Sequence, residues 1–271
     1  MDALSQLSYG PGKPTDFFAE TREERLPYCD LSRLSRIFSL ECNWKAPQSV
    51  CLGVFVGLAR PEKRWAWVTS VVGYLSVFAF VALFGWSMVL YPGGTWTNRQ
   101  TTSYRFFENF FCDSTHSHGL NGLRNAGAVF AKAALVSITP ALGLFFFCLA
   151  RVRPEALWTA RFIRGCGVLS ALCLVFVPLT PSDTFATLHA VFALAASAAG
   201  LAGLLGYLVV VRNNGRAAVP GIVLLVLVAV DVLMYVQQVQ THGPTPPALP
   251  ALQKVAAGWL LGWMLVLFRK R

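Results

Sequence analysis

The sequence is poor in charged residues, and acidic residues are the scarcer kind. Only 13% of the 271 residues are charged, with 13 Asp and Glu against 23 Lys and Arg, whereas 55% are hydrophobic. A soluble domain usually carries nearly twice that charged fraction. Because most of a soluble protein's surface must face water, so few charges exclude a single soluble core. The mean hydropathy of +0.53 favours a protein whose solvent is lipid.

The motifs that mark common catalytic and cofactor sites are also missing. The chain has no HExxH, GxSxG, P-loop or GxGxxG segment, and its seven cysteines form no CxxC pair. Only His189 lies within an apolar block, which excludes the paired intramembrane histidines of a haem protein. The first 25 residues contain no apolar run typical of signal peptides. We therefore expect no cofactor and no intrachain disulfide, and the sequence indicates no specific reaction.

The apolar residues gather in six blocks, each about as long as a helix that crosses the roughly 30 Å hydrocarbon core of a bilayer. An unpaired peptide group in hydrocarbon costs several kcal/mol, so each block is predicted to be a helix. The expected fold is an all-α, six-helix membrane bundle formed by residues 66–271. Small residues are dense in the fourth block, which predicts a central position for it. The blocks are 67–91, 126–150, 162–180, 187–211, 219–237 and 252–268.

Positive charges alternate from one connection between blocks to the next. The second and fourth connections and the C-terminal tail are rich in Arg and Lys, whereas the connections at 181–186 and 238–251 hold neither. The positive-inside rule predicts cytoplasmic termini and three outer loops, with the plasma (inner) membrane as the location. The net charge of +10 belongs to this pattern, so it favours contact with anionic membrane lipids and not with nucleic acid.

Residues 1–65 precede the first block and differ from it in composition. Gly and Pro residues at 10–14 predict an unstructured start, and residues 31–40 fit a short amphipathic helix on the inner leaflet. The apolar run at 50–59 is too short to span a membrane. Two interpretations stay open: a partly disordered, interfacial tail, or a segment that binds a cytoplasmic protein partner.

Few ionisable residues lie inside the blocks, and those that do are functional candidates by default. Lys132 and Asp231 both lie about six residues from the outer ends of their blocks, which is about 9 Å at a rise of 1.5 Å per residue. Their equal depth predicts an ion pair that specifies the bundle, or a site that holds a headgroup, an ion or a proton.

Further polar residues are predicted at the outer ends of the blocks. All four histidines fall there, at positions 116, 118, 189 and 242. Imidazole and carboxylate groups bind zinc, but only Asp113 and His116 have a spacing that suits one helix face. The histidines His116, His118 and His189 are therefore weak metal candidates, and we expect no metal site. The candidates for a lipid or ligand pocket are Glu108, Asp113, Lys132, Asp183, His189 and Asp231.

Two segments carry a resemblance to known proteins. The turn Tyr91-Pro92-Gly93-Gly94 is followed by the run 103–113, which ends on Asp113, and the segment 177–183 is followed by His189. These segments resemble bacterial six-span membrane proteins of unknown function that are similar to the DRAM/Frag/Sfk-type group. The resemblance covers residues 67–268 and implies lipid-related or stress-related membrane biology without an established reaction. The stretch 114–118 departs from the group's pattern.

The first outer loop also contains four phenylalanines at helical spacing, at positions 106, 107, 110 and 111. This spacing predicts an interfacial helix that lies flat at the outer surface with its aromatic face in the lipid. Such a helix would either anchor the outer end of the bundle or cover a lipid-sized cavity.

The leading hypothesis is a protein that binds, senses or handles lipid, or supports an envelope process, without catalysis. One alternative is a membrane-embedded lipid hydrolase or transferase with His189 and an Asp at its centre. A second alternative is a membrane regulator that acts through residues 1–65.

Overall fold

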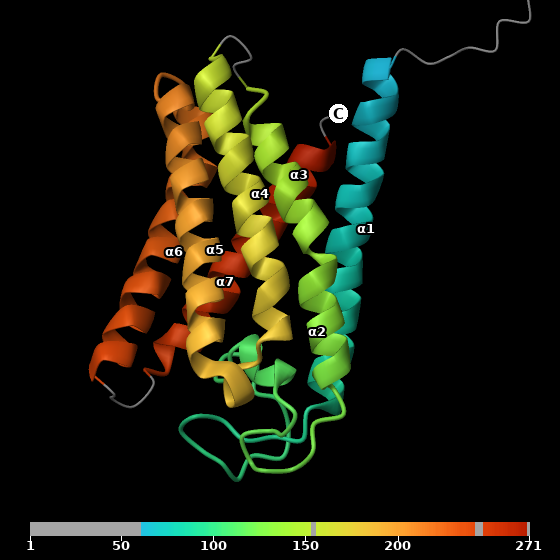
Figure 1. Ribbon diagram of the computed structural model, residues 1–271, viewed down its shortest axis with the longest axis vertical. Helices are drawn as coiled ribbons and strands as arrows, with labels where there is room; N and C mark the ends of the chain where they lie inside the picture. The colour runs from blue at the N-terminus through green and yellow to red at the C-terminus, as the bar shows by residue number, and fades with distance from the viewer. Residues whose placement is uncertain (1–60, 153–155, 242–245, 270–271) are drawn as a thin grey trace, which may run out of the picture. The chain divides into compact units, whose positions relative to one another are not determined.

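Six long apolar helices form the described part of the chain (Figure 1). The computed structural model describes residues 61–152, 156–241 and 246–269. The structures predicted for residues 10–14, 31–40 and 50–59 lie outside the described residues. Each of the six helices is long and apolar enough to cross a bilayer. The protein is therefore an all-α, multi-pass integral membrane protein.

The helices confirm the six predicted blocks, with ends that differ by a few residues. The first span is α1 (Pro61–Leu90), and the second is divided into α2 (Ala128–Ser137) and α3 (Thr139–Leu149). The other four spans are α4 (Leu157–Leu179), α5 (Ser182–Val211), α6 (Gly215–Thr241) and α7 (Ala248–Arg269). Within the described ranges, the remaining helical element is the 3-10 turn η2 (Cys112–Thr115).

The division between α2 and α3 follows from Pro140. Proline has no N–H group, so it cannot donate to the carbonyl four residues earlier, which belongs to Val136. The hydroxyl of Thr139 donates to that carbonyl instead, at 2.8 Å. The amide of Ile138 still donates to the carbonyl of Ala134, at 3.2 Å. The two pieces therefore continue in one direction and together cross the membrane as one span.

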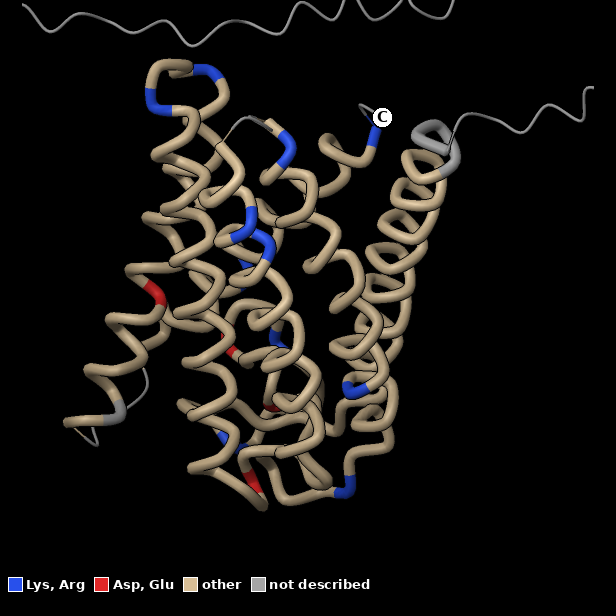
Figure 2. Tube along the Cα trace, turned by 45° about the horizontal axis from the view of Figure 1, so that its top comes forward, with Lys and Arg blue, Asp and Glu red and all other residues tan. Residues whose placement is uncertain are grey.

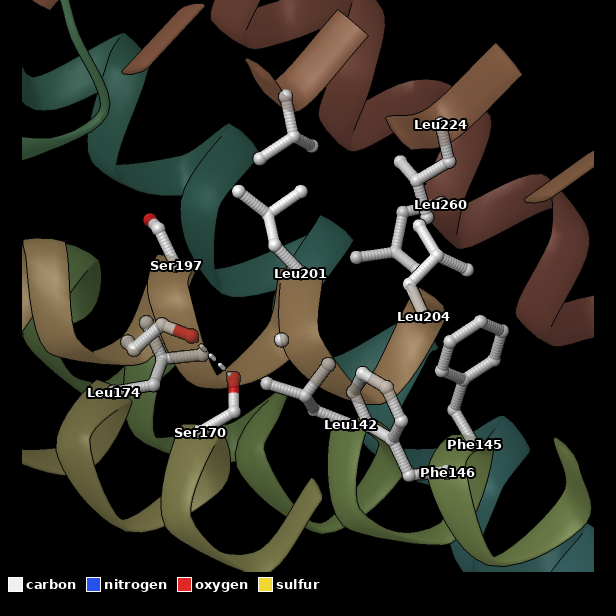
Figure 3. Close-up of a pocket in the computed structure, with 13 residues that line it drawn as sticks. Leu142, Phe145, Phe146, Ser170, Leu174, Ser197, Leu201, Leu204, Leu224 and Leu260 are labelled. Carbon is white, nitrogen blue, oxygen red and sulfur yellow. Dashed lines mark hydrogen bonds between the residues drawn. The ribbon is translucent and has the colours of Figure 1, made fainter. Parts of the chain in front are cut away.

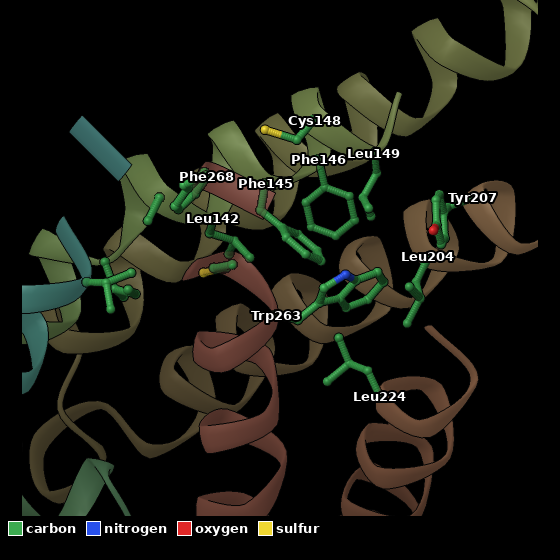
Figure 4. Close-up of a cluster of buried hydrophobic side chains, with 14 of the residues drawn as sticks. Leu142, Phe145, Phe146, Cys148, Leu149, Leu204, Tyr207, Leu224, Trp263 and Phe268 are labelled. Carbon is green, nitrogen blue, oxygen red and sulfur yellow. The ribbon is translucent and has the colours of Figure 1, made fainter. Parts of the chain in front are cut away.

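The core of the bundle lies around the aromatic residues of α3 and α7 (Figure 4). The rings of Phe145 and Trp263 meet edge to face with centroids 5.0 Å apart, and Tyr207 of α5 contacts the same indole at 5.7 Å. The second span is the most buried of the six, with 50% of its most apolar window inside the bundle. The corresponding share for α5 is 33%. The prediction that the fourth span is central is therefore wrong.

The small residues of α5 instead make room for one large side chain. A Cβ atom on Gly203 would lie 2.8 Å from the ring of Phe146, and a Cβ on Gly167 of α4 would lie 2.3 Å from the Cβ of Phe146. Phe146 thus reaches from α3 into the space that these glycines leave between α4 and α5. The small residues of α5 do allow neighbouring helices to approach closely, and the helices that do so are α3 and α4.

The long connection 91–127 and the turn between α4 and α5 share one end of the bundle, which we call the loop end. The amide of Ser117 donates to the carboxylate of Asp183 at 2.9 Å, and the amide of Phe111 donates to the side chain of Gln253 at 3.0 Å. These bonds fasten the connection to the first turns of α5 and α7. In Figure 1 the connection lies at the bottom, below α4 and α5.

The prediction of an interfacial helix in this connection is wrong. Residues 103–111 form turns, because the side chain of Asn109 accepts from the amide of Arg105 at 2.9 Å and donates to the carbonyl of Gly94 at 2.8 Å. The four phenylalanines consequently do not share a face. The ring of Phe111 packs inward against Phe84 with centroids 4.8 Å apart, whereas those at 106 and 107 are exposed.

The turn at Gly93 and Gly94 requires glycine. Gly94 has a φ of 88°, and a Cβ atom there would lie 2.3 Å from the amide nitrogen of Asn121. We predict that Gly94→Ala lowers the free energy of unfolding by roughly 2 kcal/mol or more, from backbone strain and the clash together. Thermal unfolding of the detergent-purified protein measures this. Gly258→Ala is the control, since nothing lies within 4 Å of its Cβ position. Equal stability of the two variants would contradict the assigned turn.

Candidate functional site

Three buried polar side chains hold the connection 91–127 in its irregular fold. Asn125 donates to the carbonyls of Ser114 and His116 at 2.9 and 3.0 Å, and it accepts from the amide of Gly127 at 2.9 Å. Asn109 bridges two further backbone groups of the connection. The carboxylate of Asp113 accepts from the amide of Phe110 at 2.7 Å and from the indole of Trp96 at 3.1 Å. These side chains supply the partners that a regular element would give the backbone.

A buried lysine of α7 supports the same connection from the side of the helices. Lys254 is 5% exposed, and its ammonium donates to the backbone carbonyl of Asn109. The ammonium lies 4.4 Å from the centroid of the Phe111 ring, with Tyr104 and Phe106 at 5.8 and 5.7 Å. A desolvated cation gains about 2 kcal/mol from such a ring face. Asp113 and Asp231 lie within electrostatic reach of this cation.

A cavity of about 490 Å³ lies between the connection and the helices α5, α6 and α7. We call it the polar cavity, because acidic, histidine, hydroxyl and amide side chains share its wall with apolar ones. Four of the six predicted pocket residues line it, which are Asp113, Asp183, His189 and Asp231. Sequence reasoning did not select its other polar residues, which include His116, Ser182, Tyr235 and Gln253.

Two predicted pocket residues lie elsewhere. Glu108 is exposed on the connection and does not line the cavity. Lys132 of α2 does not line it either, and it lies within electrostatic reach of His116. The predicted pair of Lys132 and Asp231 does not form. The Oδ1 atom of Asp231 is buried without a hydrogen-bond partner, and the cation that acts on this carboxylate is Lys254.

The two buried histidines of the cavity have different partners. The Nδ1 atom of His189 lies 2.9 Å from the carbonyl of Thr180 and 3.2 Å from that of Val177. Because carbonyls only accept, this nitrogen carries the hydrogen, and His189 secures the end of α4. The Nε2 atom of His116 lies 2.7 Å from the hydroxyl of Ser182. His118 is exposed beside Ser117. No group of three potential metal ligands occurs among the described residues.

Burial favours the neutral forms of the titratable groups around η2. It raises the pKa of Asp113 above its ordinary value, although hydrogen bonds from Phe110 and Trp96 act in the opposite direction. Burial lowers the pKa of His116, against the effect of the carboxylates of Asp113 and Asp183. Burial also raises the pKa of the Cys112 thiol to about 12. The imidazole of His116 is therefore a proton acceptor at neutral pH.

A second cavity of about 200 Å³ lies deeper in the bundle and is almost wholly apolar (Figure 3). Leucine and phenylalanine side chains of α3, α4, α5, α6 and α7 line it, and we call it the apolar pocket. Ser170 also lines this pocket, and its hydroxyl donates a hydrogen bond to the carbonyl of Ala196 at 2.8 Å. Ser197 of α5 lines both cavities, so the polar cavity and the apolar pocket adjoin there.

Lys254, Ser182 and His116 are the residues that sequence reasoning missed. A signal for Lys254 was present, because it is a charged residue inside the sixth apolar block. The pairing of Ser182 with His116 had no such signal, since 66 residues separate them in the chain. His116 was considered only as a weak metal candidate.

The structure predicts unequal roles for Asn125 and Glu108. Asn125→Leu leaves two buried carbonyls and one N–H unpaired, so we expect the free energy of unfolding to fall by at least ~2 kcal/mol. Glu108→Gln changes an exposed group and serves as the control, with an expected change within ~0.5 kcal/mol. Thermal unfolding in detergent compares the two. Similar losses in both variants would show that the connection is not held as described.

Comparisons of the chain with protein-family models, with curated proteins and with solved structures found no match. The resemblance to the DRAM/Frag/Sfk-type group therefore stays a prediction.

Proposed function

We propose that this integral membrane protein binds an amphiphilic lipid, with the head group in the polar cavity and a hydrocarbon chain in the apolar pocket. The observation that supports the proposal is the junction at Ser197, which lines both cavities. A polar chamber that adjoins an apolar one suits a molecule with one polar and one apolar end. Burial of a chain in the apolar pocket contributes about 0.8 kcal/mol for each CH₂ group removed from water.

The charges of the polar cavity favour a head group that donates hydrogen bonds. Three carboxylates line it, and no Lys or Arg is among its described lining residues. A bare phosphate group would meet like charges there, whereas an amine or a hydroxyl group would find acceptors. Asp231 is the acceptor with unused capacity, because its buried Oδ1 atom has no partner. Amine-bearing and polyol lipids are therefore the proposed ligands.

The proposed topology places the loop end on the outer side and both termini in the cytoplasm. Figure 2 supports this, because the coloured positions at the end opposite the loop end are all Lys or Arg, whereas the loop end carries charges of both signs. By the bounds of the helices, the arginines at or near that opposite end are Arg151, Arg161, Arg164, Arg212, Arg216 and Arg269. Arginines next to the ends of spans are typical of the cytoplasmic side. The bound lipid would then come from the outer leaflet of the plasma membrane.

The junction at Ser197 is the place to test lipid binding. We predict that a specific lipid co-purifies with the wild type in detergent, and that Ser197→Phe reduces its amount about tenfold by filling the junction. Val191→Phe is the matched control, because it enlarges an exposed side chain of the same helix. Mass spectrometry of the purified proteins measures the lipid. The proposal fails if no lipid is enriched over its share of the membrane, or if both variants bind equally.

Asp231→Asn tests the head-group chemistry in the same experiment, and it also provides a second variant should Ser197→Phe misfold. Losing a charge-assisted hydrogen bond costs about 1.5–3 kcal/mol, so an amine-bearing lipid should bind roughly 10- to 100-fold more weakly. Undiminished binding would exclude Asp231 as the acceptor for the head group.

The topology has its own prediction. A membrane-impermeant maleimide should label Glu108→Cys at the loop end of intact cells and should label Asn213→Cys, between α5 and α6, only after permeabilisation. Both positions are exposed, and Cys112 gives little background because its raised pKa keeps the thiol protonated. The reverse labelling pattern would place the loop end in the cytoplasm.

A further inference from the structure

Ser182 and His116 form a contact that the proposed lipid binding does not require. The Nε2 atom of His116 lies 2.7 Å from the Oγ atom of Ser182, and both residues line the polar cavity. A serine hydroxyl within hydrogen-bond reach of an imidazole is the arrangement that activates serine as a nucleophile. The two residues come from segments 66 positions apart, so the fold brings them together.

The position of Ser182 adds hydrogen-bond donors to this pair. Ser182 opens a single turn at the start of α5, which the non-helical backbone of Phe185 (φ −130°, ψ 53°) separates from the rest of the helix. In this turn, the amides of Thr184 and Phe185 donate to the carbonyl of Pro181, at 3.1 and 2.8 Å. The amides of Ser182 and Asp183 donate to no described residue. Free N–H groups next to the attacked carbonyl stabilise the negative oxygen that forms there.

The backbone at His116 is held in place by hydrogen bonds. The backbone carbonyl of His116 accepts from Asn125 at 3.0 Å, and the next residue, Ser117, binds the Asp183 carboxylate through its amide and hydroxyl at 2.9 and 3.0 Å. Asp113 and Asp183 lie within electrostatic reach of the ring. The carboxylate of Asp183 stabilises an imidazolium ion, which is the state that His116 enters when it accepts a proton.

We infer that Ser182 and His116 are a nucleophile and its general base, and that they cleave a carboxylic ester of the lipid held in the polar cavity. The inference rests on the proposed lipid binding and adds a reaction to it. The alternative of a lipid hydrolase placed His189 at the centre of the site. The inference assigns the role of base to His116 instead, because the Nδ1 atom of His189 secures the end of α4.

The reaction balances with water as the second substrate. The Oγ atom of Ser182 attacks the ester carbonyl while its proton passes to Nε2 of His116, and the carbonyl oxygen becomes an oxyanion. The bond to the alcohol oxygen then breaks, and that oxygen takes the proton from His116, leaving an acyl-serine. Water attacks the acyl carbon and gives a proton to His116, which returns it to Oγ as the carboxylic acid leaves.

A serine-directed probe tests the inference without a known substrate. We expect an alkyl fluorophosphonate to modify the folded wild type at Ser182, as shown by the mass of the peptide that contains it. Ser182→Ala should remove that modification. His116→Gln should slow it on the order of 10²–10⁴-fold, because a general base contributes about this factor. The controls are Ser103→Ala and His118→Gln, two exposed residues of the same connection, which should leave the rate unchanged.

Lipid co-purification is measured on the same samples, so that binding and reaction are judged separately. Bound lipid in Ser182→Ala together with wild-type labelling at Ser182 supports both proposals. An unlabelled Ser182 in folded, lipid-bound wild type overturns the catalytic inference and leaves lipid binding intact. Equal labelling of the wild type and His116→Gln also overturns it, since the contact would then be only a structural link between the connection and α5. Labelling at Ser182 without bound lipid would sink the proposed lipid binding while retaining an activated serine.

Discussion

The loop end depends on one constraint: the backbone groups of an irregular segment must find partners at a place where the bundle leaves little water. Residues 91–127 contain no regular helix beyond η2, so their amides and carbonyls cannot pair with one another in series. Asn109, Asp113 and Asn125 supply those partners from buried side chains. Because these three groups fix the path of the chain, they also fix where Trp96 and His116 face the polar cavity.

Lys254 couples that connection to the helices. Burying an isolated ammonium costs several kcal/mol, and no hydrogen-bonded carboxylate offsets that cost here. Its bond to the carbonyl of Asn109 contributes about 1.5–3 kcal/mol, and the face of the Phe111 ring about 2 kcal/mol. The cation is thus stabilised mainly by groups of the connection, so α7 and the connection hold each other in place. Loss of the connection would leave the buried ammonium without compensation. Loss of the lysine would leave the carbonyl of Asn109 unpaired.

The spans could be predicted from sequence because hydropathy sums over some twenty neighbouring residues, and one misplaced residue changes little. The depth of Asp231 and the position of His189 at the start of a span are equally local, and both line the cavity as expected. The connection could not be predicted in this way. Its four phenylalanines have helical spacing, yet the hydrogen bonds of Asn109 favour turns. The contact of Ser182 with His116 and the position of Lys254 under Phe111 depend on tertiary packing, which spacing in the chain does not encode.

The arrangement of the two cavities links binding to chemistry. Along α5, Ser182 stands in the first turn, before the non-helical Phe185, and Ser197 lies 15 residues further along the chain. A lipid whose chain enters the apolar pocket at Ser197 would extend toward Ser182, past His189 and Asp231. The head group and the ester that joins it to the chain would then lie within the polar cavity, where the imidazole, the free amides and the carboxylates are. In this proposed binding mode, a nucleophile at the loop end of the polar cavity, rather than beside the apolar pocket, is where an ester and water would both reach it.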